Sequence, residues 1–329
     1  ATDAAEPAPG MTPGAEPGAG NPGRRTARER FDPPVRRFQW TLAGPLDRAG
    51  LLAEIRARLA GDEAALARLL RHAGIHLAAH PHGEGDLPAR IAAGTRVDLH
   101  VLAWEPEALA LGPERLLAER SDWIAVDKPA HVAVQATRAS RVASRGAAPR
   151  AGADAPGLVA VHRLDRETSG VVVFARDARA AGRLGAAFRD REARKRYVAL
   201  VSPAPAQDAF EITGYIARTL HPTRYRYALR ASPAPGHRGS HTRLQVLARD
   251  GARALVEAEP VTGRTHQIRV HLEAAGAPIV GDTRYGGVPA GRVQLHAAAL
   301  GFRDRGESIE LAAPPPDDLD PAFLGLLRR

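Results

Sequence analysis

The sequence of 329 residues contains no cysteine. This absence excludes disulfide bonds and thiolate metal sites, and it suits a reducing, cytoplasmic location. No apolar run is long enough to span a bilayer, and none follows the arginines at 24–25, so we expect neither a membrane span nor an export signal. Lysine is scarce too, because Lys128 and Lys195 are the only lysines among 46 basic residues. A lysine retained among so many arginines is a candidate for a position that needs a compact ammonium group.

The sequence also lacks a nucleotide-binding loop and a clear metal-ligand cluster. The histidines from His72 to His82 lie close together in sequence. Gly74 and Pro81 interrupt the helix that would align them, and no carboxylate or cysteine completes a set. We therefore favour surface imidazoles over a metal site, and we expect no cofactor.

The charge balance points to a polyanionic partner. The net charge is +9 at pH 7, and the sequence pI is about 10.7. Such a chain favours nucleic acid over a membrane surface as its partner. With 44% hydrophobic residues, the chain can bury a sizeable core and has room for more than one domain.

The first third of the chain divides into a tail and a small unit. Residues 1–30 are rich in Ala, Pro and Gly without a periodic apolar face, so we expect a disordered basic tail. Residues 36–104 show two amphipathic helix patterns, the second closed by Gly74, and then strand patterns at 75–77 and 96–102. These patterns predict a small α/β module.

A Pro/Glu-rich linker at 105–115 leads into the largest segment, 116–312, and a Pro/Asp-rich tail follows at 313–329. Within the large segment we expect several strands and a helix at 177–194 with an arginine-rich outer face. The stretch at 138–156 is predicted to be a long mobile loop.

The stretch HRLDRETSG at 162–170 is the most informative one. Apolar runs at 158–161 and 171–174 flank it, and each is typical of a buried strand, so the stretch is predicted to be a loop anchored at both ends. Asp165 lies between two arginines, which would keep its carboxylate ionised and available as a nucleophile. An ordinary salt-bridged turn explains this loop equally well.

Two further blocks add basic and aromatic side chains. RKRYVALV at 194–201 is a basic cluster that runs into an apolar strand, with Tyr197 at its start. Residues 215–230 alternate aromatics and cations, a pattern that suits base stacking with phosphate contacts but equally suits an exposed β-hairpin.

The block GRTHQIRVHL at 263–272 is predicted to be a helix. Good helix formers follow it, and Gly-Ala-Pro then ends the pattern. Helical spacing places His266 and Arg269 on one face, with Thr265 as the expected N-cap.

These three blocks, in this order, resemble the three signatures of the RluA-type RNA pseudouridine synthases. The resemblance covers about 116–311. It implies an α+β pseudouridine synthase fold, with a mainly antiparallel mixed sheet flanked by helices and loops. Residues 36–104 resemble, with divergence, the S-four-like RNA-binding module that often precedes these enzymes.

The resemblance also implies roles for individual residues. Asp165 would be the catalytic carboxylate, Tyr197 would stack on the base, and Arg269 would hold Asp165 in a bidentate pair, with Arg264 as the alternative partner. Arg163 would fill the gap left by a flipped nucleotide. The full set of expected substrate contacts is Arg163, Leu164, Arg166, Lys195, Arg264, His266 and Leu295.

The implied activity is isomerisation of a uridine in RNA to pseudouridine, without a cofactor, by a cytoplasmic monomer. Large-subunit ribosomal RNA is the first expected substrate and transfer RNA the second. Whether Asp165 attacks the sugar, attacks the base or removes a ribose proton stays open. The alternatives are a non-catalytic RNA-binding protein and a nucleoside or glycoside hydrolase. The hydrolase needs a second carboxylate, and we expect Glu167 to point away from Asp165.

Overall fold

The computed structural model describes residues 34–104, 112–134, 158–219 and 226–327. The expected disordered tail at 1–30 and the expected mobile loop at 138–156 lie outside these residues. Residues 105–111 of the expected linker do so as well. The described strands form a four-stranded sheet, an 11-stranded sheet and a two-stranded ribbon.

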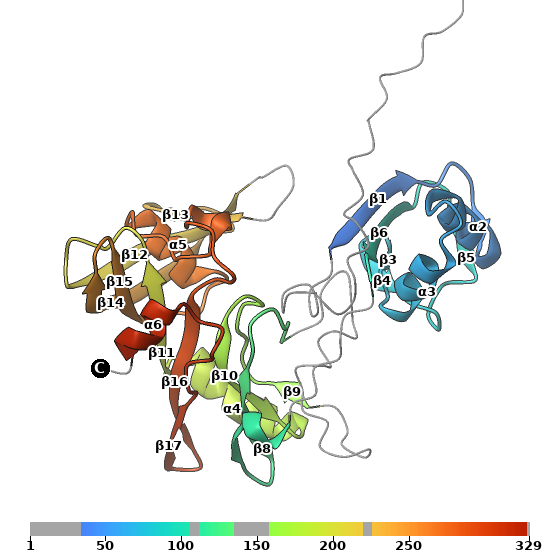
Figure 1. The fold of residues 1–329 in the computed structure, drawn as a ribbon. Helices are drawn as coiled ribbons and strands as arrows, with labels where there is room; N and C mark the ends of the chain where they lie inside the picture. Colours follow the sequence, from blue (N-terminus) through green and yellow to red (C-terminus); the bar gives the residue numbers. More distant parts are fainter. Residues whose placement is uncertain (1–33, 105–111, 135–157, 220–225, 328–329) are drawn as a thin grey trace, which may run out of the picture.

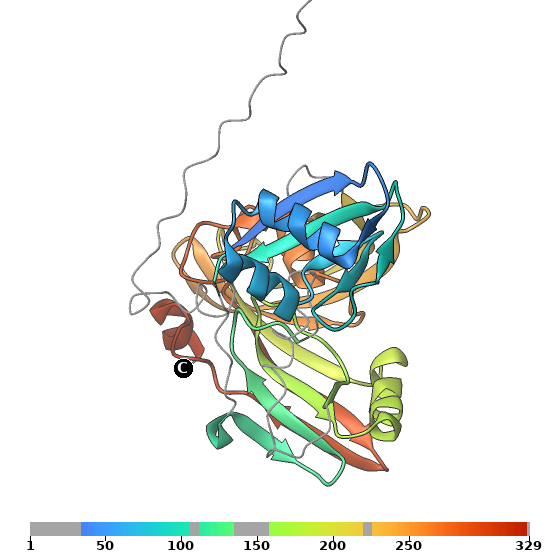
Figure 2. The ribbon, with the colours of Figure 1, turned by 90° about the vertical axis from the view of Figure 1, so that its right-hand side faces the viewer.

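The four-stranded sheet belongs to the N-terminal part of the chain and has the order β1-β6-β3-β4. Helices α2 and α3 cover one face of it (Figure 2), and Leu51, Ile55, Leu66 and Leu69 pack from them onto the sheet. The predicted helices and the strands at 75–77 and 96–102 are confirmed, whereas the first strand was not predicted. The elements are β1 (Val35–Thr41), β2 (Leu46–Asp47), α2 (Arg48–Arg58), α3 (Glu63–Arg71), β3 (Ile75–Leu77), β4 (His80–His82), β5 (Arg90–Ile91) and β6 (Arg96–Leu102).

The predicted closure of the second helix at Gly74 is confirmed, because the N–H of Gly74 donates to the carbonyl oxygen of Leu69 at 2.8 Å, while Ala73 takes the left-handed conformation with φ 52°. Close packing also requires glycine here, since a Cβ at position 74 would lie 2.7 Å from the carbonyl oxygen of His100. The expectation of surface imidazoles was wrong for two histidines. His72 and His76 are buried and are not surface imidazoles. The S-four-like character of this part stays a prediction.

The 11-stranded sheet runs in the order β13-β12-β14-β15-β11-β16-β10-β8-β7, with β17 beside β16 and β9 beside β10 (Figure 1). Among the strands that the structure describes, only the pair β10 and β16 is parallel, which confirms the predicted mainly antiparallel mixed sheet. Its strands are β7 (Leu116–Glu119), β8 (Trp123–Lys128), β9 (Val159–Ala160), β10 (Ser169–Ala175), β11 (Arg194–Val201), β12 (Ala209–Thr219), β13 (Arg226–Arg230), β14 (Arg238–Asp250), β15 (Arg253–Pro260), β16 (Leu295–Asp304) and β17 (Glu307–Ala312).

Helices α4 (Ala178–Arg189), α5 (Gln267–Ala274) and α6 (Pro321–Leu327) accompany this sheet. Leu184 and Ala187 of α4 are buried in a cluster with residues of β8, β10 and β16. This helix ends five residues before the predicted end at 194, because strand β11 already begins at Arg194. The short 3₁₀ helices are η2 (Pro113–Arg115) and η4 (Thr283–Tyr285).

The predicted helix at the third block is confirmed as α5. Its N-cap was predicted wrongly: His266, not Thr265, caps the helix, in a left-handed conformation with φ 56° and without a side-chain capping bond. Because the His266 side chain makes no capping bond, its ring can contact the hydroxyl of Tyr285 in the site described below.

Candidate active site

Residues 162–168 form the loop between β9 and β10, and His162 anchors its entry. The His162 ring stacks on Phe188 of α4 with the ring centroids 4.5 Å apart. Its Nε2 accepts a hydrogen bond from the backbone N–H of Val173 at 3.1 Å. Burial lowers the pKa of His162 to about 3, so the ring stays neutral and keeps this acceptor. The neutral ring of His162 therefore fixes the entry of the loop.

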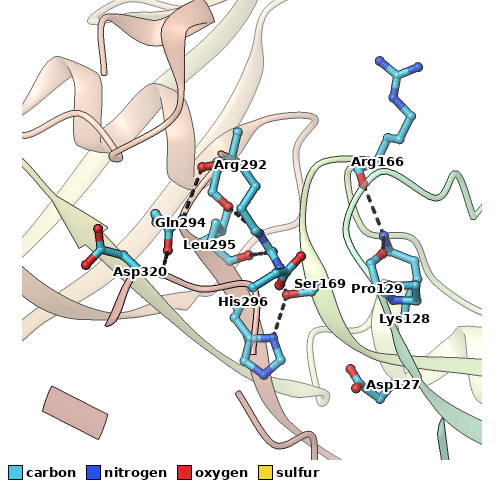
Figure 3. Close-up of polar contacts among 12 residues, drawn as sticks. Asp127, Lys128, Pro129, Arg166, Ser169, Arg292, Gln294, Leu295, His296 and Asp320 are labelled. Carbon is cyan, nitrogen blue, oxygen red and sulfur yellow. Dashed lines mark hydrogen bonds and ion pairs between the residues drawn. The ribbon is translucent and has the colours of Figure 1, made fainter. Parts of the chain in front are cut away.

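Lys128 holds the middle of the loop from within the core (Figure 3). Its ammonium is fully buried at the end of β8 and donates to the carbonyl oxygens of Pro129 at 2.8 Å, Val132 at 2.9 Å and Arg166 at 3.4 Å. Three acceptors match the three N–H groups of an ammonium. Burial lowers the pKa of Lys128 to about 7. A compact ammonium suits this narrow site better than a planar guanidinium would.

Arg269 of α5 lies at the centre of the site, with a side chain only 2% exposed. It forms a bidentate pair with Asp282, Nε to Oδ2 at 2.6 Å and Nη2 to Oδ1 at 2.8 Å. Its remaining nitrogen, Nη1, lies 3.3 Å from Glu167 Oε2 and 3.5 Å from Asp165 Oδ2. Arg269 is thus an ion-pair partner of Asp165. The predicted bidentate geometry of this pair was wrong, because the bidentate pair of Arg269 is with Asp282.

The expectation that Glu167 points away from Asp165 was also wrong. Both carboxylates reach the same Nη1 of Arg269. Burial alone would raise the pKa of Glu167, but the charges of Arg269 and Arg166 outweigh it and lower that pKa to about 2. Glu167 is therefore ionised at neutral pH and holds no proton to donate.

Tyr197 on β11 faces the loop from the other side. The pairing of β11 with β16 shifts register between Arg196 and Val198, and such irregularities redirect side chains next to active sites. Burial, together with the nearby charge of Asp165, raises the pKa of Tyr197, so the phenol stays protonated. Tyr197 offers a ring for stacking and an O–H donor.

His266 presents one ring nitrogen to the pocket. Tyr285 is fully buried, and its hydroxyl accepts from the backbone N–H of Tyr227 at 3.2 Å and lies 2.7 Å from His266 Nδ1. Because burial lowers the pKa of His266, the neutral ring can accept the hydroxyl proton at Nδ1. Its own proton is then on Nε2, which provides a donor at the pocket wall.

A pocket of about 770 Å³ collects almost all of the predicted site residues. Arg166 is the exception and does not line it, although its carbonyl is held by Lys128. Arg264 lines it but donates from Nε to the carbonyl oxygen of Gly239 at 2.8 Å, so the alternative pairing with Asp165 was wrong. The predicted residues that line the pocket are Arg163, Leu164, Asp165, Lys195, Tyr197, Arg264, His266, Arg269 and Leu295.

Two residues that hold the pocket side chains in place were not among the predicted site residues. Asp282 pairs with Arg269, and Tyr285 contacts His266. Asp282 and Tyr285 lie together in a glycine-flanked stretch after α5, and that spacing was the only signal for them. Among the described residues, no group of three or more His, Asp or Glu side chains is placed to hold a metal ion. None of the described helices is long and apolar enough to cross a membrane.

Comparison with known proteins identifies the family. The family model for RNA pseudouridylate synthase matches residues 122–274. An uncharacterized RNA pseudouridine synthase of Mycobacterium bovis is 33% identical over 299 residues, which cover 81% of this chain and 91% of that protein. The chain belongs to the RNA pseudouridine synthase family.

Other members of the family match a smaller part. The ribosomal large subunit pseudouridine synthase C of Escherichia coli O157:H7 is 37% identical over 175 residues, 49% of this chain and 54% of that one. A chloroplastic RNA pseudouridine synthase 2 of Oryza sativa is 34% identical, with 50% of this chain and 43% of that protein covered. This family member thus spans about half the length of the first curated relatives it matches.

Solved structures support the predicted pseudouridine synthase fold. The human RNA pseudouridylate synthase domain containing 1 has a TM-score of 0.52 at 29% identity and covers 64% of this chain and 86% of that one. The human RNA pseudouridylate synthase domain containing 4 has a TM-score of 0.53 at 24% identity, with 65% of this chain and 92% of that one covered, and it shows the fold alone.

Proposed function

We propose that the protein is an RNA pseudouridine synthase that isomerises a uridine in RNA, with Asp165 as its catalytic carboxylate. One observation carries the proposal: in a member of this family, the Asp165 carboxylate lines a pocket beside the buried guanidinium of Arg269 and the phenol of Tyr197. Ionic pairing with Arg269 orients the carboxylate within the pocket.

The reaction needs only groups that the pocket provides. The bond between uracil N1 and ribose C1′ breaks, the base turns, and a bond forms between C5 and C1′. N1 gains a proton and C5 loses one, so no oxidant or outside group takes part. Asp165 would act at the sugar or the base, Tyr197 would stack on the base, and Arg163 would fill the space left in the RNA by the flipped uridine.

Cations on the pocket wall favour RNA as the substrate. Arg189 and Arg191, at the end of α4, line the pocket together with Lys195 and Arg264. Such a wall can neutralise phosphates next to the flipped nucleotide. Relatives named as ribosomal large subunit pseudouridine synthases favour large-subunit ribosomal RNA, with transfer RNA as the second candidate. We also propose action as a single chain and in the cytoplasm, a compartment that suits a sequence without cysteine.

A hydrolase is the competing enzymatic function, because Glu167 lies near Asp165 at the shared guanidinium. A glycosidase needs one of its two carboxyl groups protonated as general acid. Glu167, with a pKa of about 2, is ionised and does not fit that role.

The test compares pseudouridine maps of total RNA from cells with and without the protein, complemented by variants. Asp165→Asn should abolish the mapped pseudouridine while the purified variant keeps its RNA affinity. The matched control Glu167→Gln should retain at least about a tenth of the activity. Glu167 affects the site only through its charge, and such a residue contributes less to the rate than the group that reacts. Product formation by Asp165→Asn would overturn the assignment. Unchanged maps without the protein would favour the RNA-binding alternative.

A further inference from the structure

Ser169, where the active-site loop enters β10, is held by two buried side chains (Figure 3). Its hydroxyl accepts from Arg292 Nη2 at 2.8 Å and lies 2.9 Å from His296 Nδ1. His296 Nε2 lies 3.2 Å from the carbonyl oxygen of Ala313, and burial lowers the pKa of His296 to about 4. The neutral ring therefore donates from Nε2 and accepts the Ser169 proton at Nδ1, so the hydroxyl is fully paired.

Arg292 connects Ser169 to the C-terminal tail. Its Nη1 donates to Asp318 Oδ1 at 2.7 Å, and the guanidinium is 2% exposed while the Asp318 side chain is 50% exposed. Its Nε and Nη2 also reach the carbonyl oxygens of Val293 at 3.2 Å and Leu295 at 3.3 Å. These bonds fix the plane of the guanidinium, and Asp318 supplies the compensating charge.

The residues next to Asp318 in the sequence are anchored to the sheet. Leu319 and Phe323 are buried in a cluster with Val198 and Leu200 of β11, and α6 lies beside this strand (Figure 1). The backbone N–H of Asp320 donates to Gln294 Oε1 at 2.8 Å (Figure 3). The C-terminal tail is therefore packed against the sheet, and this packing fixes the position of Asp318.

We propose that Asp318 is a positioning residue for the active site, acting through Arg292 and Ser169 on the loop that carries Asp165. The last link is local, because the N–H of Thr168 donates to the carbonyl oxygen of Asp165 at 3.1 Å. Without its carboxylate partner, the buried guanidinium keeps an uncompensated charge, and its hold on Ser169 weakens. Small displacements of a reacting group are costly in rate. This inference rests on the proposed function.

The kinetic test compares Asp318→Asn with Asp317→Asn in the full chain. Asp317 is the neighbouring exposed carboxylate, and no hydrogen bond or ion pair of its side chain is seen among the described residues. The substrate is RNA with tritium at uridine C5, prepared from cells that lack the protein. Asp318→Asn should lower kcat about tenfold at unchanged KM. Asp317→Asn should match the wild type, and kcat is measured at a temperature at which thermal unfolding curves show both variants to be fully folded. Equal kcat values for the two variants would overturn the proposal.

A double-mutant cycle tests whether Asp318 acts on the active-site loop through Arg292. If Asp318 acts through Arg292, then Asp318→Asn should cost nothing further in an Arg292→Met background. Losses that multiply would overturn the proposed path.

Hydrogen exchange of the loop at 163–170 separates this inference from the proposed function. Exchange should be faster in Asp318→Asn than in Asp317→Asn, whether or not tritium is released. A wild type that releases no tritium while the loop responds this way would defeat the proposed function and leave the positioning role in place. Identical loop exchange in both variants would defeat the positioning role.

Discussion

At the scale of single residues, Arg269 is shared by three carboxylates, and the sharing is unequal. Asp282 takes the short bidentate pair, and Glu167 and Asp165 share the remaining nitrogen at 3.3 and 3.5 Å. The longest contact belongs to the residue proposed to react. A carboxylate that is oriented but not doubly bonded keeps an oxygen available for chemistry, whereas the pair with Asp282 keeps the guanidinium in place.

A single hydroxyl is predicted to set the tautomer of His266. Tyr285→Phe removes the group that joins Tyr227 N–H to His266 Nδ1, so we expect a loss of about 1 kcal/mol in unfolding free energy and a severalfold lower rate. Histidine ¹⁵N NMR of the wild type should show the His266 proton on Nε2. Tyr215→Phe is the control, because its hydroxyl has no hydrogen bond among the described residues. Equal unfolding free energies for the two variants would contradict the prediction.

At the scale of elements, the parallel contact between β10 and β16 joins the loop to the rest of the sheet. Gly170 pairs with Ala297 in this register and has φ 116°. A Cβ at position 170 would lie 2.2 Å from the carbonyl oxygen of Ala297. Only glycine lets the two strands approach where the loop ends, and this approach brings Ser169 to His296.

Gly170→Ala should therefore destabilise the protein by several kcal/mol, because backbone must move to relieve the clash. Gly182→Ala is the matched control: it lies on α4 with no atom within 4 Å of the added Cβ. There the substitution should raise the unfolding free energy by up to about 1 kcal/mol, as alanine favours helix. Urea denaturation of both variants measures the difference. A Gly170→Ala variant as stable as the wild type would rule out the close approach.

At the scale of the whole molecule, three histidines on different elements are desolvated and neutral, namely His162 in the active-site loop, His271 on α5 and His296 on β16. Burial lowers the pKa of His162 to about 3 and that of His271 and His296 to about 4. The unfolded chain binds protons on these rings below about pH 6.5 while the folded protein does not. Their contribution to stability is complete above that pH and is lost as the pH falls towards 4.

We therefore predict acid destabilisation well above the range in which carboxylates titrate. Each of the three rings should contribute a slope of up to about 1.4 kcal/mol per pH unit between pH 6.5 and 4. Urea denaturation at pH 7, 6 and 5 measures it, and His271→Gln should reduce the slope. An unfolding free energy that stays constant from pH 7 to 5 would refute this prediction.

Local patterns predicted much of the fold, and the resemblance to a family predicted most of the residues that line the pocket. Alternating apolar residues located β6 to the residue, an apolar run indicated the strand that is β11, and helix formers before a Gly-Ala-Pro stop identified α5. Local patterns did not reveal the close partners, because contacts such as Arg269 with Asp282 depend on how α5 packs and not on spacing. The direction of the Glu167 side chain, which points toward Arg269, was predicted wrongly for the same reason.

By itself, the sequence determined most of the strands and helices, and it placed Asp165 on a loop that leads into the buried strand β10. These properties follow from periodicity and turn chemistry, which act over a few residues. Only the tertiary structure decided which charges meet. Asp165, Asp282 and Asp318 are the same residue type in the sequence. In the folded protein Asp282 forms the bidentate pair with Arg269, Asp165 lies near the remaining nitrogen of Arg269, and Asp318 pairs with Arg292. The burial of the Arg269 and Arg292 guanidinium groups fixes these contacts, because a buried charge must find a partner wherever the fold brings one.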